Sequence, residues 1–182
     1  SGELRVPPHS LEAERSVLGG VLLDNSVVHT LAEILEVADF YSEGNARIYE
    51  AMRELYSSGT PVDSITLREK LAQAEKLNAC GGDEYLLSLT DVIPTTQNIE
   101  HHARIVKDKA RVRRMIMACH EVAQAGYGDH GECQEFLDGA EKKVFDVANV
   151  TAKKTTEHIK DVLLTAFKQI RDLAENGDRV AG

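Results

Sequence analysis

The segment QNIEHHARIVKDKARVRRMIMACHEVAQA, residues 97–125, contains the longest uninterrupted helical pattern of the chain. Apolar residues recur at helical spacing in one stripe, formed by Ile105, Val112, Ile116, Cys119 and Ala123. The glycine-containing segment GYGDHGE, residues 126–132, then turns the chain, and a second apolar stripe runs through residues 133–149. Two helices joined by a short loop of this kind form an antiparallel hairpin.

The stripe on residues 97–125 is longer than the short returning helix can cover. A second copy of the hairpin could cover the remaining apolar surface, so the sequence predicts self-association through this region. By their apolar spacing, Ile116 and Val122 could lie inside the hairpin core or on the surface that contacts another protein chain.

The first 96 residues predict a compact subdomain of short helices. Ser10 and Asp63 are expected N-caps, and the segments SSGTP (57–61) and NACGGDE (78–84) interrupt the helical pattern. Gly19 and Gly20 fall inside the first expected helix, where a glycine costs about 1 kcal/mol relative to alanine. We expect the close approach of another helix to compensate for it.

The segment IKDVLLTAFKQIRDLAENG, residues 159–177, predicts one more amphipathic helix. Its expected docking face contains Ile159, Leu163, Phe167 and Ile170. Together these patterns predict an all-α chain with three parts. They are a globular helical subdomain (5–96), a protruding hairpin (97–150), and a linker with its helix (151–176).

The composition limits the classes of function. The 182 residues carry a net charge of -9, which opposes strong nonspecific binding of DNA phosphates. The three cysteines show no disulfide pattern, and no apolar run approaches the ~20 residues that span a bilayer, so we expect a cytoplasmic location. Aromatic residues make up 5% of the chain and tryptophan is absent, which favours an aliphatic helical core.

One basic cluster, KDKARVRR (107–114), is a candidate for contact with DNA. Lys107, Arg111 and Arg114 share a helix face and could guide a single strand, so a single-stranded nucleic-acid binding module is an alternative function. The same cations could instead form a solvated face balanced by acids such as Asp108.

No catalytic, cofactor or metal site is expected in these residues. The chain has no glycine-rich phosphate loop, no HExxH and no GxSxG motif. Cys119, His120, His130 and Cys133 could be read as zinc ligands, but their order is not that of a common zinc finger. From the residues alone, this is a helical interaction module, and whether the chain has an enzymatic activity stays open.

Four segments resemble the N-terminal part of bacterial replicative DNA helicases of the DnaB type. They are RVPPHSLEAERSVLGGVLLDN (5–25), ADFYSEGNARIYEAMRELYSSGTPVDSITLREKL (38–71), GGDEYLLSLTDVIPTTQNIEHHARIVKDKARVRRMI (81–116) and IKDVLLTAFKQI (159–170). The resemblance extends from about Arg5 to Gly182. In that family the following segment is a RecA-like ATPase domain, to which ATP, Mg²⁺ and DNA unwinding belong.

The resemblance also implies a set of partners. Hairpins would pair into dimers, and three dimers would form the N-terminal collar of a hexamer with single-stranded DNA in its channel. The last helix would pack against the ATPase domain of the neighbouring subunit, and a helicase loader is a further candidate partner. The collar would recruit the primase C-terminal domain to the replication fork, with contacts from Glu12, Tyr85, Ile116 and Val122.

Overall fold

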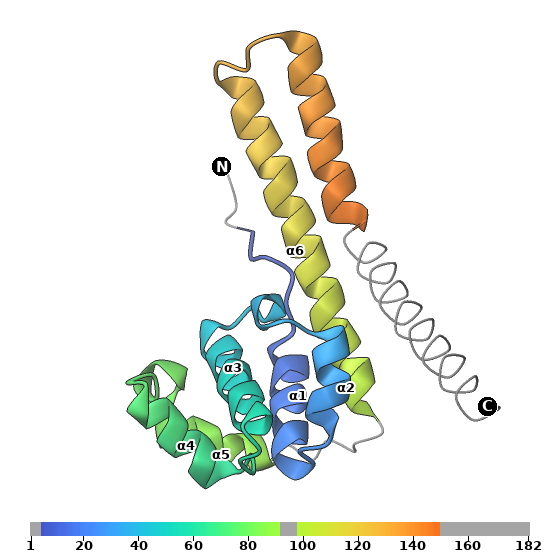
Figure 1. Ribbon diagram of the computed structural model, residues 1–182. Helices are drawn as coiled ribbons and strands as arrows, with labels where there is room; N and C mark the ends of the chain where they lie inside the picture. The colour runs from blue at the N-terminus through green and yellow to red at the C-terminus, as the bar shows by residue number, and fades with distance from the viewer. Residues whose placement is uncertain (1–4, 92–97, 150–182) are drawn as a thin grey trace, which may run out of the picture. The chain divides into compact units, whose positions relative to one another are not determined.

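The computed structural model describes residues 5–91 and 98–149, and every regular element in these stretches is a helix (Figure 1). In chain order they are α1 (Leu11–Leu23), α2 (Val27–Ile34), the 3-10 helix η1 (Val37–Asp39), α3 (Glu43–Ser57), α4 (Ser64–Gln73), the 3-10 helix η2 (Asn78–Cys80), α5 (Gly82–Asp91) and α6 (Ile99–Tyr127). A further helix covers residues 133–149. The all-α fold class predicted from the sequence is confirmed.

Local caps determine where the helices begin. The Ser10 side chain accepts from the backbone N–H of Ala13 at 3.3 Å, and Asp63 accepts from the N–H groups of Ile65 and Thr66 at 2.9 Å each. Thr66 closes a capping box, because its hydroxyl accepts from the backbone N–H of Asp63. Each cap satisfies N–H donors that have no partner within their own helix. The predicted caps at Ser10 and Asp63 are confirmed.

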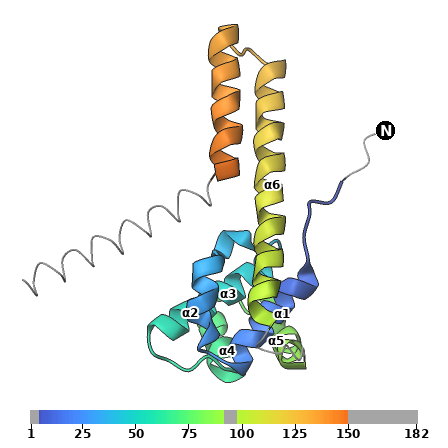
Figure 2. The same cartoon turned by 90° about the vertical axis from the view of Figure 1, so that its right-hand side faces the viewer.

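The chain divides into two compact units, one up to Arg114 and one from Met115 onward. In the first unit, α1 contacts α2, α3 and α5, and Figures 1 and 2 show it among them. Its apolar side chains form the core together with those of α3, including Val17, Leu18, Ile48 and Met52. This core is aliphatic, as the composition predicts.

Gly20 allows α6 to approach α1 closely. A Cβ placed on Gly20 would lie 2.2 Å from Cδ1 of Ile99, the first residue of α6. Any side chain at position 20 would therefore displace Ile99 from the core. The predicted close approach of another helix at this glycine is confirmed.

The first turns of α6 belong to the core of the first unit. Ile99, Ala103, Val106 and Ala110 are buried at helical spacing. The apolar stripe predicted from the sequence lies on a different face of α6, and its members Val112, Ile116 and Cys119 are exposed. The division between the units falls inside α6, whereas the sequence-based boundary was drawn between residues 96 and 97.

The second unit, as far as it is described, consists of the end of α6 and the helix at 133–149. The two helices run side by side, as both views show, and an ion pair joins Lys143 to Glu121 (Figures 1 and 2). Phe136 packs against the end of α6, with its Cζ 3.2 Å from a Cβ placed on Gly126. These contacts form the expected antiparallel hairpin. The expected linker helix, with Ile159, Leu163, Phe167 and Ile170, lies outside the described residues.

None of the helices that the structure describes combines the length and the apolar character needed to cross a bilayer.

Candidate functional site

The predicted contact residue Glu12 lies on the first turn of α1. Its side chain is exposed, two residues after the Ser10 cap. A carboxylate at this position is favoured by the positive end of the helix dipole. The charge is therefore held at the surface, whereas the next two residues, Ala13 and Glu14, are buried.

The second predicted contact, Tyr85 on α5, is half-buried and fixed in orientation. Its hydroxyl donates to Asn45 Oδ1 at 2.7 Å, and burial raises the pKa of the phenol above its usual 10.0. Gly81, with φ at +95°, precedes α5, and a Cβ there would lie 2.7 Å from the Tyr85 Cβ. The glycine both permits the left-handed turn and leaves room for the tyrosine.

A buried carboxylate, Glu14, fixes the position of Asn45, the hydrogen-bond partner of Tyr85. Asn45 donates from Nδ2 to Glu14 Oε2 at 2.8 Å, and Glu14 also accepts from the backbone N–H groups of Tyr41 and Ser42 at 2.6 and 3.3 Å. Glu14 is thus buried with three donors around it, as a buried carboxylate requires. The sequence placed Glu14 only near the positive end of a helix, and no signal in it identified Asn45 as the link to Tyr85.

The two remaining predicted contacts, Ile116 and Val122, lie on α6 in the second unit. The Ile116 side chain is half exposed and that of Val122 is partly buried. Ile116 is therefore not a core residue of the single chain. Glu12 and Tyr85 belong to the first unit, whereas Ile116 and Val122 belong to the second.

The second unit exposes several large apolar side chains. The exposed fractions of these residues are 50% for Ile116, 61% for Met117, 51% for Leu137 and 64% for Phe145. They come from both helices of the hairpin. Large apolar side chains exposed on both helices of a small unit make it a candidate for binding another protein.

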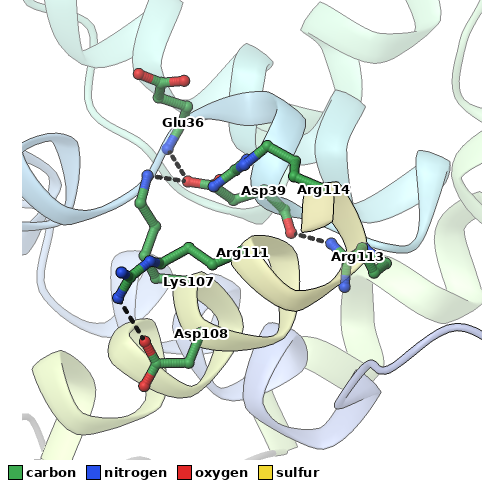
Figure 3. A network of polar contacts seen from close by, with 7 residues as sticks. All are labelled: Glu36, Asp39, Lys107, Asp108, Arg111, Arg113 and Arg114. Atoms are coloured by element: carbon green, nitrogen blue, oxygen red, sulfur yellow. Dashed lines mark hydrogen bonds and ion pairs between the residues drawn. The ribbon is translucent and has the colours of Figure 1, made fainter. Parts of the chain in front are cut away.

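The basic cluster is directed at a buried acid. Asp39, with 0% of its side chain exposed, accepts from Lys107 Nζ at Oδ2 and from Arg114 Nη1 at Oδ1, each at 2.8 Å (Figure 3). The backbone N–H of Glu36 also donates to Asp39 Oδ2 at 2.8 Å. Two cations and one N–H thus neutralise and solvate one carboxylate between η1 and α6.

The other arginines of the cluster have different roles. Arg113 donates to the carbonyl oxygens of Pro8 at 2.8 Å and Asp39 at 2.5 Å, which ties the N-terminal segment to α6. Arg111 forms an exposed pair with Asp108 at 3.7 Å (Figure 3). Of the three predicted DNA contacts, Lys107 and Arg114 are occupied by Asp39, and contact with DNA stays a prediction.

The zinc alternative finds no support in the geometry of the described chain. Among residues 5–91 and 98–149, no three His, Cys, Asp or Glu side chains gather as metal ligands would. Cys119 and Cys133 are both exposed free thiols.

Known proteins are similar to this chain in sequence and fold. A family model described as the DnaB-like helicase N terminal domain matches residues 6–108. The replicative DNA helicase DnaB of Geobacillus stearothermophilus is 37% identical over 98% of this chain, and the replicative DNA helicase DnaC of Bacillus subtilis is 36% identical over the same share. The chain spans 39% of the length of each of these relatives.

Solved structures agree with this similarity. The crystal structure of the N-terminal domain of DnaB helicase from Mycobacterium tuberculosis matches 78% of this chain and 99% of its own, with a TM-score of 0.72 and 36% identity. The N-terminal domain of the Helicobacter pylori DnaB helicase, described with its interactions with primase, has the same fold. Its TM-score is 0.58 and its identity 23%, over 64% of this chain and 90% of its own. From this fold and these matches, the chain belongs to the family of DnaB-like helicase N-terminal domains.

Proposed function

We propose that this domain is the N-terminal collar of a replicative DNA helicase, where it joins subunits and recruits primase. The observation that carries the proposal is the exposed apolar face of the second unit, formed by Ile116, Met117, Leu137 and Phe145. The first unit has a buried apolar core, whereas among the described apolar residues of the second unit only Ala118 is buried, so the second unit has much less core of its own. A scaffold that assembles other chains requires such a face and needs no catalytic group.

Self-association follows from the chemistry of that face. A second copy of the hairpin presents the same apolar surface, and two identical patches pair around a two-fold axis. In the proposed assembly the hairpins pair into dimers and three dimers form a hexameric collar. Burial of apolar surface stabilises such contacts by about 25 cal/mol per Å² before the costs of association.

Recruitment of primase rests on the rigid surface around Tyr85. Its ring is held by Asn45 and Glu14, so a partner would meet a surface that is already ordered. The description of the Helicobacter pylori relative includes its interactions with primase, which supports the same class of partner here. Six collar subunits would offer several docking positions and raise the local concentration of primase.

The rest of the helicase cycle belongs, in this proposal, to the remaining part of the parent protein. ATP and Mg²⁺ would bind in its RecA-like ATPase domain and drive unwinding. The segment at 159–170 would dock on the ATPase domain of the neighbouring subunit through Ile159, Leu163, Phe167 and Ile170. Single-stranded DNA would pass through the ring channel, a loader would assist assembly, and all of this would take place in the cytoplasm.

The test is a solution mass measured over a range of concentrations by sedimentation equilibrium. We expect the mass to rise to at least that of a dimer, and to rise again when the C-terminal domain of primase from the same organism is added. A chain that stays monomeric at high concentration and does not bind primase would contradict both parts of the proposal.

A further inference from the structure

Arg15, on the second turn of α1, has an unusual environment next to Tyr85. Its Cζ lies 5.8 Å from the centroid of the Tyr85 ring, and its Nη2 donates to Ser88 Oγ at 3.4 Å. The Nε atom is buried and has no hydrogen-bond acceptor. The guanidinium is therefore held between two residues of α5 by an aromatic ring and one long hydrogen bond.

This environment differs from that of most other cations of the chain. Lys107 and Arg114 share the carboxylate of Asp39, and Arg68 donates to Asp83 at 2.6 Å. Within residues 5–91 and 98–149, Arg15 has no carboxylate at ion-pair distance. A guanidinium has five N–H donors, and the described chain engages one of them.

The chemistry of Arg15 favours a carboxylate as its missing partner. A planar guanidinium binds a carboxylate with two parallel hydrogen bonds, and the ring beneath it keeps it in place before binding. The chain has a net charge of -9, which opposes the many negative charges of a nucleic acid strand more than the single charge of one carboxylate.

We propose that Arg15 binds an Asp or Glu side chain of the primase C-terminal domain at the surface formed by Glu12, Arg15 and Tyr85. This inference rests on the proposed function. Glu12 is exposed beside Arg15, so the matching surface of the partner carries an acidic residue for Arg15 and a basic residue for Glu12.

The experiment measures the affinity of the primase C-terminal domain for Arg15→Gln and Arg15→Lys by calorimetry at low and at high salt. We expect Arg15→Gln to weaken binding by at least about tenfold, because one partner of a desolvated charge pair is lost. Arg15→Lys should retain part of the affinity, since it keeps the charge but loses the paired hydrogen bonds. The salt dependence of binding should decrease in Arg15→Gln.

Arg53→Gln is the matched control. The Arg53 guanidinium lies over the Tyr49 ring at 5.9 Å, in the same kind of contact, but on α3, which supplies none of the three residues of the proposed surface. We expect it to bind primase like the wild type. Thermal unfolding of each variant separates a loss of contact from a loss of fold.

Two results would overturn the inference while the proposed function stands. They are wild-type affinity in Arg15→Gln, and an equal loss of affinity in Arg53→Gln. If Arg15→Gln does not fold, Arg15→Lys decides, and an affinity within about twofold of the wild type would overturn the inference. A wild-type domain that does not bind primase at all would instead contradict the proposed function.

Discussion

The two units of this chain handle apolar and charged groups differently. The first unit buries Val17, Leu18 and Leu31 completely and also encloses two carboxylates, Glu14 and Asp39, each with several donors. In the described part of the second unit only Ala118 among the apolar residues is buried, and no carboxylate is enclosed. The first unit is therefore built to be stable alone, and the second is built to be completed by another chain.

The largest effect is expected from removing the acid at the centre of the first unit. Asp39→Asn would leave Lys107 and Arg114 without their shared carboxylate, and we expect a loss of about 3–5 kcal/mol in the free energy of unfolding. Urea denaturation measures this. Asp108→Asn, which breaks the exposed pair with Arg111, should change stability by less than about 1 kcal/mol. Similar values for both variants would show that burial of Asp39 has no energetic consequence.

A charge on the apolar face of the second unit should affect association and leave the fold intact. Ile116→Asp is half exposed in the single chain, so we expect an almost unchanged melting temperature but a dimer dissociation constant raised by at least about tenfold. Ala125→Asp adds the same charge at an exposed position on the opposite side of α6 and is the control. A strong loss of stability in Ile116→Asp would instead place Ile116 in the hairpin core.

Two glycines test the packing of helices in the two units. Gly20→Ala would place a Cβ against buried Ile99, and we expect a loss of about 1–3 kcal/mol despite the better helix propensity of alanine. Gly139 lies in the helix at 133–149 and has open space around it, so Gly139→Ala should stabilise the chain by up to about 1 kcal/mol. Thermal unfolding monitored by circular dichroism measures both. A stabilising Gly20→Ala would show that Ile99 moves aside easily.

A smaller effect concerns Tyr49 in the core of the first unit. Burial raises its pKa from 10.0 to about 12, and its hydroxyl has no hydrogen-bond partner in the described chain. The neutral phenol is favoured in the folded state, so its contribution to stability is complete below pH 10 and is lost as the pH rises towards 12. At pH 11 the free energy of unfolding of the wild type should be about 1 kcal/mol lower than at pH 7 for this reason, whereas Tyr49→Phe should not show this loss.

Denaturation of the wild type and Tyr49→Phe at pH 7 and pH 11 measures this difference. Tyr56, which is exposed, supplies the control Tyr56→Phe. Parallel alkaline losses in the wild type and in Tyr49→Phe would mean that Tyr49 does not cause them.

The smallest effect is expected for nucleic acid. Because Lys107 and Arg114 are engaged by Asp39 and the chain is acidic, we expect no affinity for single-stranded DNA tighter than about millimolar at physiological salt. A titration at several salt concentrations measures this. Tight binding with a steep salt dependence, lost in Arg111→Gln, would favour the nucleic-acid binding alternative.

Features that depend on neighbouring residues could be predicted from the sequence. The caps at Ser10 and Asp63 act within three residues, and the hairpin follows from one long helical pattern, a glycine-containing turn and a second pattern. The close approach of another helix at Gly20 was also predictable, because a glycine inside a helix costs stability that such a contact can offset.

The buried face of α6 could not be predicted with the same rules. Ala103 and Ala110 carry a weak hydrophobic signal, whereas Val112 and Ile116 carry a strong one, so the sequence indicated the stripe on the hairpin and not the buried face. Ile99 at the start of α6 packs against Gly20 of α1, and Ala103 and Ala110 on the same face of α6 are buried with it.

By itself, the sequence determined the helices, their ends, the acidic charge and the presence of surplus apolar surface. Only the tertiary structure decided the roles of the ionised side chains. Asp39 meets Lys107 and Arg114 across 68 and 75 residues, and Tyr85 reaches Asn45 across 40. Capping and periodicity act over a few residues and are visible in the sequence, whereas the partner of a buried charge depends on which distant segments the core brings together.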